Sequence, residues 1–313
     1  MNYGLPYQGS KNRIAKRLVD ALPPAPVLYD VFCGGCAVTH AAMLSGKYQR
    51  FVINDRRGWL PDAFREAING GYAHEDRWIS REDFKRLKST DAYAALCFSF
   101  GNNARTYMYA PPLEPYKRAL HYAIFWRDFA PWAALCPETA DALAAGLAPS
   151  EGRKQRRVQA GKFIVESLKQ QLSAGTLSPD ILEKPIYRQI RKVKNTSESL
   201  QRLERLERLE SLPGALTAHS GDYRELCFDE PGIIYCDPPY MSVYAKGKDY
   251  GCEFDAEAFY SWCEAQKLPV YISEYQMPED RFVPVASFTV TRKMDAKKSS
   301  ICHEKIWRPR IQL

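Results

Sequence analysis

The sequence predicts an α/β fold built on a doubly wound, mostly parallel sheet. Three short stretches have the branched and aromatic composition of buried strands and are bounded by Gly, Asp or Pro: residues 27–32, 50–55 and 232–236. A helix-like segment lies between the first two of these stretches and ends at Gly46. A strand, a glycine-rich turn, a helix and a second strand ending in Asp is the arrangement of a doubly wound sheet.

Further strands are expected near the C-terminal end of the sequence. Residues 216–220 and 269–275 resemble the first three stretches in composition. Two late stretches, 284–292 and 303–309, are expected to pair as an antiparallel hairpin at the end of the sheet.

Segment 58–213 interrupts this alternation of strands and helices. It holds an aromatic, amide-rich and proline-punctuated stretch at 99–112, followed by a basic and helical run. From Leu200 onward, leucines recur every three residues, a spacing that drifts around a helix and does not keep a coiled-coil seam. An amphipathic helix is the simpler interpretation, and an oligomerisation zipper is the alternative. We therefore expect a largely helical insertion at 58–213 within a domain formed by 1–57 and 214–313.

The composition is that of a globular protein without a membrane segment. Of its 313 residues, 45% are hydrophobic and 26% are charged, and the formal net charge is +7. No apolar run approaches the roughly 18 residues that a membrane helix needs, and the first residues lack the apolar stretch of a signal peptide. We expect a cytoplasmic protein, and the basic charge allows a polyanionic partner without requiring one.

The nine cysteines raise a question about the segment YDVFCGGCAV, residues 29–38. Its Cys33-x-x-Cys36 spacing is compatible with a redox or metal site, while its strand-then-glycine pattern is compatible with a loop around a nucleotide-like cofactor. No second pair with ligand spacing completes a tetrahedral zinc site. We expect reduced, mostly buried thiols and no metal.

Asp237-Pro238-Pro239-Tyr240 follows the predicted strand 232–236 directly. A carboxylate at the C-terminal end of a central parallel strand lies where such sheets bind ligands. The two prolines prevent a helical continuation and leave the Pro238 carbonyl free to accept a hydrogen bond. An acceptor carboxylate, an acceptor carbonyl and an aromatic ring suit a planar heterocycle that carries an exocyclic amine. A plain proline turn after a strand is the alternative.

With its upstream segments, this motif resembles a known enzyme family. DPPY at 237–240, DVFCGGC at 30–36 and PYQGSKNR at 6–13 are similar, in order and spacing, to the motifs of the Dam-like (alpha-group) S-adenosylmethionine-dependent DNA adenine methyltransferases. The resemblance implies a Rossmann-like class I methyltransferase sheet with an inserted target-recognition lobe. The chain departs from the family pattern at Val31, where the family has Pro, and at Cys36, where it has Gly or Ala. The resemblance assigns Cys33 and Cys36 to the cofactor loop.

The resemblance implies S-adenosylmethionine as the cofactor. The glycine turn would allow close backbone approach to the methionine moiety, Asp55 would accept from the ribose hydroxyls, and the segment around Asp222 would contact the cofactor's adenine. The residues implied for cofactor contact are Tyr7, Gly9, Lys11, Asp30, Phe32, Gly34, Gly35, Asp55, Asp222, Tyr223 and Asp237.

The implied reaction is methyl transfer to the exocyclic amine of an adenine. Asp237 and Pro238 would accept from the amine, and Tyr240 would stack on the ring, with Pro239 keeping the turn rigid. An adenine inside a duplex cannot reach such a pocket, so base flipping is expected. The stretch 241–255 is expected to form a loop over the site, and Glu304 and Arg308 resemble a late family pattern near the DNA.

The expected partner is double-stranded DNA, held by the insertion. Lys and Arg supply phosphate contacts, while Asn and Arg side chains suit base edges and tyrosines can stack. The alternatives are a loop packed on its own domain and solvated basic helix faces. The candidate DNA-binding residues are Asn102, Asn103, Arg105, Tyr107, Tyr109, Arg153, Lys154, Arg156, Arg157, Arg188, Arg191, Lys192 and Lys194.

Two other functions compete with this one. The first is methylation of RNA adenine or of cytosine, although cytosine enzymes of this kind carry Ser in place of the first Asp. The second is a nucleic-acid-binding module that has lost catalysis. The sequence contains no nuclease signature, so a partner restriction endonuclease would be a separate chain. Neither the oligomeric state nor the recognised DNA site follows from the sequence.

Overall fold

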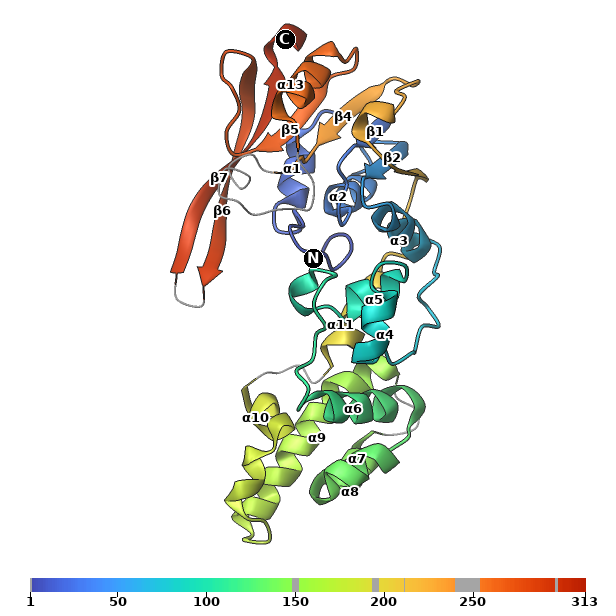
Figure 1. Cartoon of the computed structure of the whole chain (residues 1–313), viewed down its shortest axis with the longest axis vertical. Helices are drawn as coiled ribbons and strands as arrows, with labels where there is room; N and C mark the ends of the chain where they lie inside the picture. The colour runs from blue at the N-terminus through green and yellow to red at the C-terminus, as the bar shows by residue number, and fades with distance from the viewer. Residues whose placement is uncertain (1, 148–151, 193–196, 211, 240–253, 296–297) are drawn as a thin grey trace. The chain divides into compact units, whose positions relative to one another are not determined.

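The computed structural model describes residues 2–147, 152–192, 197–210, 212–239, 254–295 and 298–313 (Figure 1). The chain divides into two compact units. Unit 1 comprises Met1–Gly70 and Leu209–Leu313, and unit 2 comprises Gly71–Arg208. The helix α3 (Trp59–Ile68) belongs to unit 1, although the predicted insertion begins at residue 58.

Unit 1 contains one mixed sheet in which, within the described residues, seven strands follow the order β3-β2-β1-β4-β5-β7-β6. The first five strands of that order run parallel, and β7 pairs antiparallel with both β5 and β6. The predicted α/β fold with a mostly parallel sheet and an antiparallel C-terminal hairpin is confirmed. The strand bounds are β1 Val27–Asp30, β2 Arg50–Asp55, β3 Ala215–Ser220, β4 Gly232–Cys236, β5 Val270–Glu274, β6 Phe282–Asp295 and β7 Lys298–Pro309.

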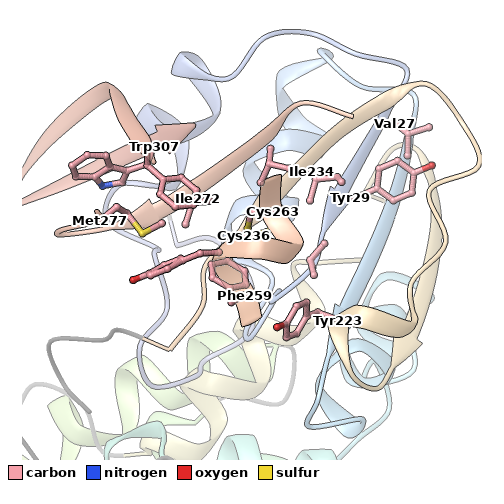
Figure 2. Close-up of a cluster of buried hydrophobic side chains, with 14 residues drawn as sticks. Val27, Tyr29, Tyr223, Ile234, Cys236, Phe259, Cys263, Ile272, Met277 and Trp307 are labelled. Atoms are coloured by element: carbon pink, nitrogen blue, oxygen red, sulfur yellow. The ribbon is translucent and has the colours of Figure 1, made fainter. Parts of the chain in front are cut away.

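The central strands are buried on both faces, as their near-continuous apolar sequences predict. One face packs against α13 (Ala256–Ala265), which contributes Phe259 and Cys263 to a cluster with Tyr29, Ile234 and Ile272 from three neighbouring strands (Figure 2). Unit 1 also contains α1 (Ala15–Ala21) and α2 (Ala37–Ser45). Helix α2 ends at Gly46, whose φ of +69° is the left-handed conformation typical of a glycine C-cap.

Unit 2 is helical. Its helices are α4 Arg81–Leu87, α5 Ala92–Cys97, α6 Glu114–Trp126, α7 Ala130–Leu135, α8 Pro137–Gly146, α9 Arg153–Ser173, α10 Pro185–Lys192 and α11 Glu198–Glu207. Leu200, Leu203 and Leu206 of α11 are buried within the unit, as the amphipathic interpretation of the leucine row expects. Across the described ranges, no helix has the length and apolar character needed to cross a membrane.

Candidate active site

Three aspartates lie at the same edge of the sheet because each ends, or directly follows, a parallel strand. Asp30 ends β1, Asp55 ends β2 and Asp237 follows β4. Strand β1 lies between β2 and β4, so the strand order reverses here, and ligands bind in open α/β sheets at such a reversal. Asn54 braces this edge, since its buried amide donates to the carbonyls of Val31 at 3.1 Å and Gly221 at 3.2 Å. Asn54 was not among the predicted site residues.

The glycine turn between β1 and α2 leaves its backbone accessible. Gly34 has a φ of +48°, and among the described residues no atom beyond Gly34 and its chain neighbours lies within 4 Å of the position that a Cβ would occupy. Its N–H donates to Oδ2 of Asp55 at 2.9 Å, which joins the turn to the end of β2. The turn closes through a 2.7 Å hydrogen bond from the Cys36 N–H to the Cys33 carbonyl. A group placed against Gly34 would meet backbone and no side chain.

Cys33 and Cys36 are buried free thiols within this turn. Burial raises the pKa of Cys36 and raises that of Cys33 well above its ordinary value, which keeps both sulfurs protonated and poorly reactive. Cys36 precedes α2 with a φ of +53°, a conformation that glycine adopts without strain. The backbone at this position therefore favours glycine, and Cys36 holds it at a conformational cost. In the part of the chain that the structure describes, no group of three or more His, Cys, Asp or Glu side chains could hold a metal ion.

The second departure from the family pattern, Val31, makes a hydrogen bond that proline cannot make. Its N–H donates to the Tyr235 carbonyl at 3.0 Å and continues the pairing of β1 with β4 by one residue. Its carbonyl accepts from Asn54. Val31 therefore strengthens the sheet at the edge that carries the aspartates.

The N-terminal segment packs directly on the glycine turn. The Leu5 N–H donates to the Gly35 carbonyl at 2.7 Å, and the Gly4 N–H donates to Nδ1 of His40 at 2.9 Å. A Cβ on Gly4 would lie 2.7 Å from the Ala37 nitrogen, so no larger residue fits without a shift of backbone. Gly4 was not among the predicted site residues, because only the folded turn reveals how close this approach is.

Tyr7 and Gly9 continue this segment. The Tyr7 hydroxyl accepts a hydrogen bond from the Arg57 guanidinium, and its ring meets Trp59 edge-on with the ring centroids 6.0 Å apart. Gly9 is exposed and has a φ of +81°, with open space around it. Tyr7 is therefore held by residues that directly follow β2 and Asp55.

Asp30 is buried and only partly satisfied. Its Oδ2 accepts a 2.5 Å hydrogen bond from the Thr39 hydroxyl, while its Oδ1 has no hydrogen-bond partner among the described residues. Burial, with smaller contributions from the charges of Asp237 and Asp55, raises the pKa of Asp30 to about 7. A buried acceptor without a donor is costly unless a ligand supplies one.

Asp55 is oriented by backbone donors. Its Oδ2 accepts from Gly34, and its Oδ1 accepts from the Arg57 N–H at 2.8 Å. Burial raises its pKa, and these two hydrogen bonds oppose the shift. Each carboxylate oxygen keeps a second lone pair, which leaves acceptor capacity for the hydroxyls of a ligand.

Asp237 is held by a buried lysine. Nζ of Lys11 lies 2.6 Å from Oδ1 of Asp237 and 2.9 Å from Oε1 of Glu304, whose oxygen also accepts from the Ser273 hydroxyl at 2.9 Å. Burial raises the pKa of Asp237 to about 6, with Lys11 opposing the shift and Glu304 adding to it. The adjoining Pro238 is buried.

The other residues predicted at this site have varied positions. Pro239 is half-buried, and Tyr240, like the stretch 241–253, lies outside the described residues. Arg308 places its guanidinium over the Tyr271 ring, 5.2 Å from the centroid. Glu304, which the sequence analysis related only to a late family pattern, instead forms part of the charged group around Lys11.

Phe32 and Tyr223 pack together in the core. Their ring centroids are 5.1 Å apart, and Tyr223, at 9% exposure, also meets Trp262. Tyr223 meets Phe259 of the same cluster as well (Figure 2). Asp222 is paired with Arg224, whose side-chain hydrogen bond lowers the pKa of Asp222 to about 2. The structure thus gives Tyr223 a packing role, and contact of either residue with a cofactor adenine stays a prediction.

The candidate base-reading loop of unit 2 is mostly self-supporting. Tyr107 and Tyr109 are buried, with their hydroxyls bonded to the Ile79 carbonyl and to Ser199. The prediction that they stack on or wedge into DNA is not supported by these positions. Asn103 is engaged within the loop, since its Oδ1 accepts from the N–H groups of Arg105 and Thr106.

Other residues of the loop reach solvent. Arg105 is exposed, and Phe100, which the sequence analysis did not single out, is 65% exposed. Asn102 has a φ of +59°, and its Oδ1 is buried without a partner among the described residues.

The basic cluster at 153–157 is largely internal to unit 2. Arg156 is buried and its Nε donates to the Ile124 carbonyl at 2.6 Å. Arg157 pairs with Glu204 of α11 through two hydrogen bonds, and Arg153 pairs with Glu207 of α11. Lys154 is exposed. The predicted phosphate-binding role therefore lacks support for the three arginines, because they brace helices against one another.

The second basic cluster, 188–194, is only partly described. Arg188 is exposed and paired with Glu183. Lys194 lies outside the described residues, and only the backbone of Arg191 and Lys192 is described.

One family model matches the first third of the chain. Residues 7–105 match the family model described as D12 class N6 adenine-specific DNA methyltransferase. This match includes Lys11, the glycine turn and Asp55, and it ends before Asp237. It supports the resemblance to adenine-specific DNA methyltransferases. No curated protein matches the sequence.

A solved structure was also compared with the chain. It is a crystal structure of a protein from Haemophilus influenzae whose own description proposes it to be a methylase. The two chains are 9% identical, the alignment covers 97% of this chain and 90% of that one, and the TM-score is 0.29. A TM-score this low establishes neither a shared fold nor a shared activity.

Proposed function

We propose that the protein is a site-specific DNA methyltransferase that transfers a methyl group from S-adenosylmethionine to the exocyclic amine of a flipped-out adenine. The observation that carries the proposal is the position of Asp237, which follows the central strand β4 at the reversal of strand order and is held by a lysine of the N-terminal segment. The Dam-like assignment with its DPPY motif, as well as a cytoplasmic location, belongs to the same proposal. The family match at 7–105 supports this chemistry.

The residues around the glycine turn fit S-adenosylmethionine. Among the described residues, Oδ1 of Asp30 is a buried acceptor without a donor and Gly34 has open space beside its backbone, while Asp55 keeps acceptor capacity for hydroxyls. When bound, the cofactor supplies a methyl group already activated by the sulfonium charge. Asp55 would hold the ribose, the Gly34–Gly35 backbone would border the methionine moiety, and Asp30 would accept from a donor at the same end.

Asp237 and Pro238 would position the target amine. Both offer acceptors that hold amine protons and direct the nitrogen lone pair outward, and placement of the reacting atoms is the main requirement of the transfer. The amine nitrogen becomes more positive as it attacks, and the Asp237 carboxylate stabilises that charge. Lys11 fixes the orientation of Asp237 through the 2.6 Å ion pair.

An adenine can enter this site only outside the helical stack, at an unpairing cost of a few kcal/mol. Tyr240 would recover part of that cost, since a base–aromatic stack is worth roughly 1–3 kcal/mol. The exposed Arg105 and Phe100 of unit 2 are the described side chains of the 99–109 loop best suited to reach the bases or backbone.

The test is transfer of labelled methyl from S-adenosylmethionine to unmethylated duplex DNA by the wild-type protein, by Asp237→Ala and by a matched control. Asp229→Ala suits as control because Asp229 is exposed on the loop before β4. After digestion to nucleosides, label on adenine that is lost only in Asp237→Ala is expected. An RNA substrate and S-adenosylmethionine binding are tested in parallel. Label on RNA and none on DNA would make RNA the substrate, and absence of cofactor binding would identify a module without catalysis.

A further inference from the structure

The last two strands form an arm that extends beyond the sheet of unit 1. Strand β7 pairs with β5 over three residues, Trp307 to Lys305, whereas its pairing with β6 continues to Asp295↔Lys298. Residues 288–295 and 298–304, here called the arm, thus pair only with each other within the described residues (Figure 1). Seven residues of extended chain reach about 20 Å.

The arm extends from the edge of the sheet that carries the candidate active site. Because β7 runs antiparallel to β5, the residues before Lys305 continue past Glu274, where β5 ends. This is the edge at which Asp30, Asp55 and Asp237 lie. The arm also begins at the site itself, since Glu304 at its base contacts the same lysine that holds Asp237. A substrate that approaches Asp237 therefore comes to the edge of the sheet from which the arm projects.

The arm and the helix beside its base are basic. By sequence, the arm carries Arg292, Lys293 and Lys298, of which the structure describes the backbone, against one acidic residue, Asp295, apart from the buried Glu304. The exposed Arg17 of α1 packs against the base of the arm. Its guanidinium lies 5.2 Å from the centre of the Phe288 ring and its Nη1 donates to the Thr289 carbonyl at 3.4 Å.

We propose that the arm binds the phosphate backbone of duplex DNA beside the target base. This inference rests on the proposed function and assigns the DNA grip to a region other than the 153–157 cluster, whose arginines are internally paired. A basic two-stranded ribbon of this length can follow the duplex backbone without reading its sequence. The alternative role of lysines on an edge strand is to prevent edge-to-edge association of sheets. If that is their role, removing them should cause aggregation and leave DNA binding unchanged.

The experiment compares two triple variants of the full chain, each lacking three positive charges. The arm variant carries Arg292→Gln, Lys293→Gln and Lys298→Gln. The control carries Arg50→Gln, Lys267→Gln and Arg310→Gln. Arg50 begins β2, Lys267 precedes β5 and Arg310 follows β7, so all three control positions lie at the opposite edge of the sheet. Binding of a duplex is measured between 50 and 300 mM salt, with S-adenosylmethionine affinity measured in parallel.

Each lost phosphate contact lowers the slope of log Kd against log salt concentration by about 0.9. We expect a slope lower by about 2 to 3 and a Kd at least tenfold higher at low salt for the arm variant, with unchanged cofactor affinity, and wild-type values for the control. Wild-type slope and affinity in the arm variant, with or without aggregation, would overturn the proposal. If the wild-type protein binds DNA with this arm dependence but transfers no methyl group, the proposed reaction fails while the arm stands.

Discussion

Nζ of Lys11 lies 2.6 Å from Oδ1 of Asp237, although 226 residues separate the two in the sequence. Glu304 completes the group, with its Oε1 2.9 Å from the same Nζ. Burial alone lowers the pKa of Lys11, but the charges of Asp237 and Glu304 outweigh it, so the net shift is upward and the lysine keeps its charge. One cation thus serves two carboxylates, which leaves Asp237 easier to protonate than an exposed aspartate.

The first prediction concerns the pH dependence of methyl transfer. In the proposed reaction Asp237 stabilises the charge that develops on the target amine only when it is ionised, and its pKa is raised to about 6. Values of kcat/KM should therefore fall tenfold per pH unit below about 6 and level off above it, since kcat/KM reports ionisations of the free enzyme. Initial rates at low DNA concentration between pH 5 and 8 would check this, and a flat profile across that range would contradict it.

The second prediction is a pair of opposite shifts in the acid limb, the part of the pH profile in which kcat/KM falls below about pH 6. Glu304→Gln removes the negative charge that raises the pKa of Asp237, so the limb should move to lower pH. Lys11→Met removes the positive charge that opposes this rise in pKa, so the limb should move to higher pH. The same variant should lose about 3–5 kcal/mol of stability, because two buried carboxylates lose their partner.

Ser273→Ala is the matched control for this pair, because it removes a hydrogen bond to Glu304 without changing any charge. Its acid limb should stay near that of the wild type. Shifts of the same sign in Glu304→Gln and Lys11→Met would refute an electrostatic origin. The pH–rate profile is the readout that separates this positioning role of Lys11 from a purely structural one.

The third prediction contrasts Gly34 of the glycine turn with Gly4 of the N-terminal segment that packs on it. A Cβ on Gly4 would meet the backbone of the turn, so Gly4→Ala should cost more than about 3 kcal/mol of stability. A Cβ on Gly34 meets open space, so Gly34→Ala should cost only about 1–2 kcal/mol for the left-handed backbone. That methyl group would nonetheless occupy the space proposed for the cofactor, and S-adenosylmethionine affinity should fall at least tenfold.

Gly46→Ala provides the control for Gly34→Ala. Gly46 has a φ of +69°, also with open space around it, and it closes α2 at the end remote from the turn. Its alanine variant should show a similar stability loss with unchanged cofactor affinity by calorimetric titration. Equal loss of affinity in both variants would mean that the effect arises from general destabilisation.

The fold follows from the sequence more readily than the site does. Strands such as 232–236 are buried on both faces, and this burial requires the apolar, β-branched runs that the sequence displays. Asp237 could be predicted from its place after such a strand. The partnership of Lys11 with Glu304 could not, because it depends on β7 crossing back beside β5 and on how far β7 extends.

The predicted DNA face was harder to judge for a related reason. An arginine-rich run has the same composition whether its guanidinium groups face solvent or carboxylates from another helix. Arg157 faces Glu204, 47 residues away, which no local pattern indicates. Tyr107 and Tyr109 likewise carry polar tips that suit a base-stacking residue, but their hydroxyls find partners inside unit 2.

The fourth prediction separates the structural arginines from the exposed lysine of the 153–157 cluster. Arg156→Gln removes a buried guanidinium that donates to the Ile124 carbonyl, and should cost about 1–3 kcal/mol of stability. Lys154→Gln changes an exposed side chain and should alter stability by less than about 0.5 kcal/mol. Urea unfolding of both variants would test this, and equal stabilities would show that Arg156 is not a brace.

The fifth prediction concerns Asp30, whose carboxyl group costs stability when it is ionised. Its folded-state pKa is about 7 against an ordinary value of 3.8, so between these pH values the folded protein holds a proton that the unfolded chain has lost. Stability must then fall as pH rises through this window, and the full cost applies above pH 7. Asp30→Asn keeps an acceptor for Thr39 and removes the charge. It should stabilise the protein at pH 8 by on the order of 1–4 kcal/mol, with little gain at pH 4.

The same substitution tests whether that cost serves cofactor binding. An amide can still accept one hydrogen bond but no longer offers an anion to a donor on the ligand, so Asp30→Asn should bind S-adenosylmethionine more weakly as it becomes more stable. Thr39→Val is the counterpart, since it removes the 2.5 Å hydrogen bond and leaves the charge, and it should destabilise the protein at pH 8. Thermal unfolding at pH 4 and pH 8, with and without cofactor, measures both effects. A stabilised Asp30→Asn variant that binds the cofactor as tightly as the wild type would remove Asp30 from the site, because a buried charge without a ligand to satisfy it would then serve no binding role.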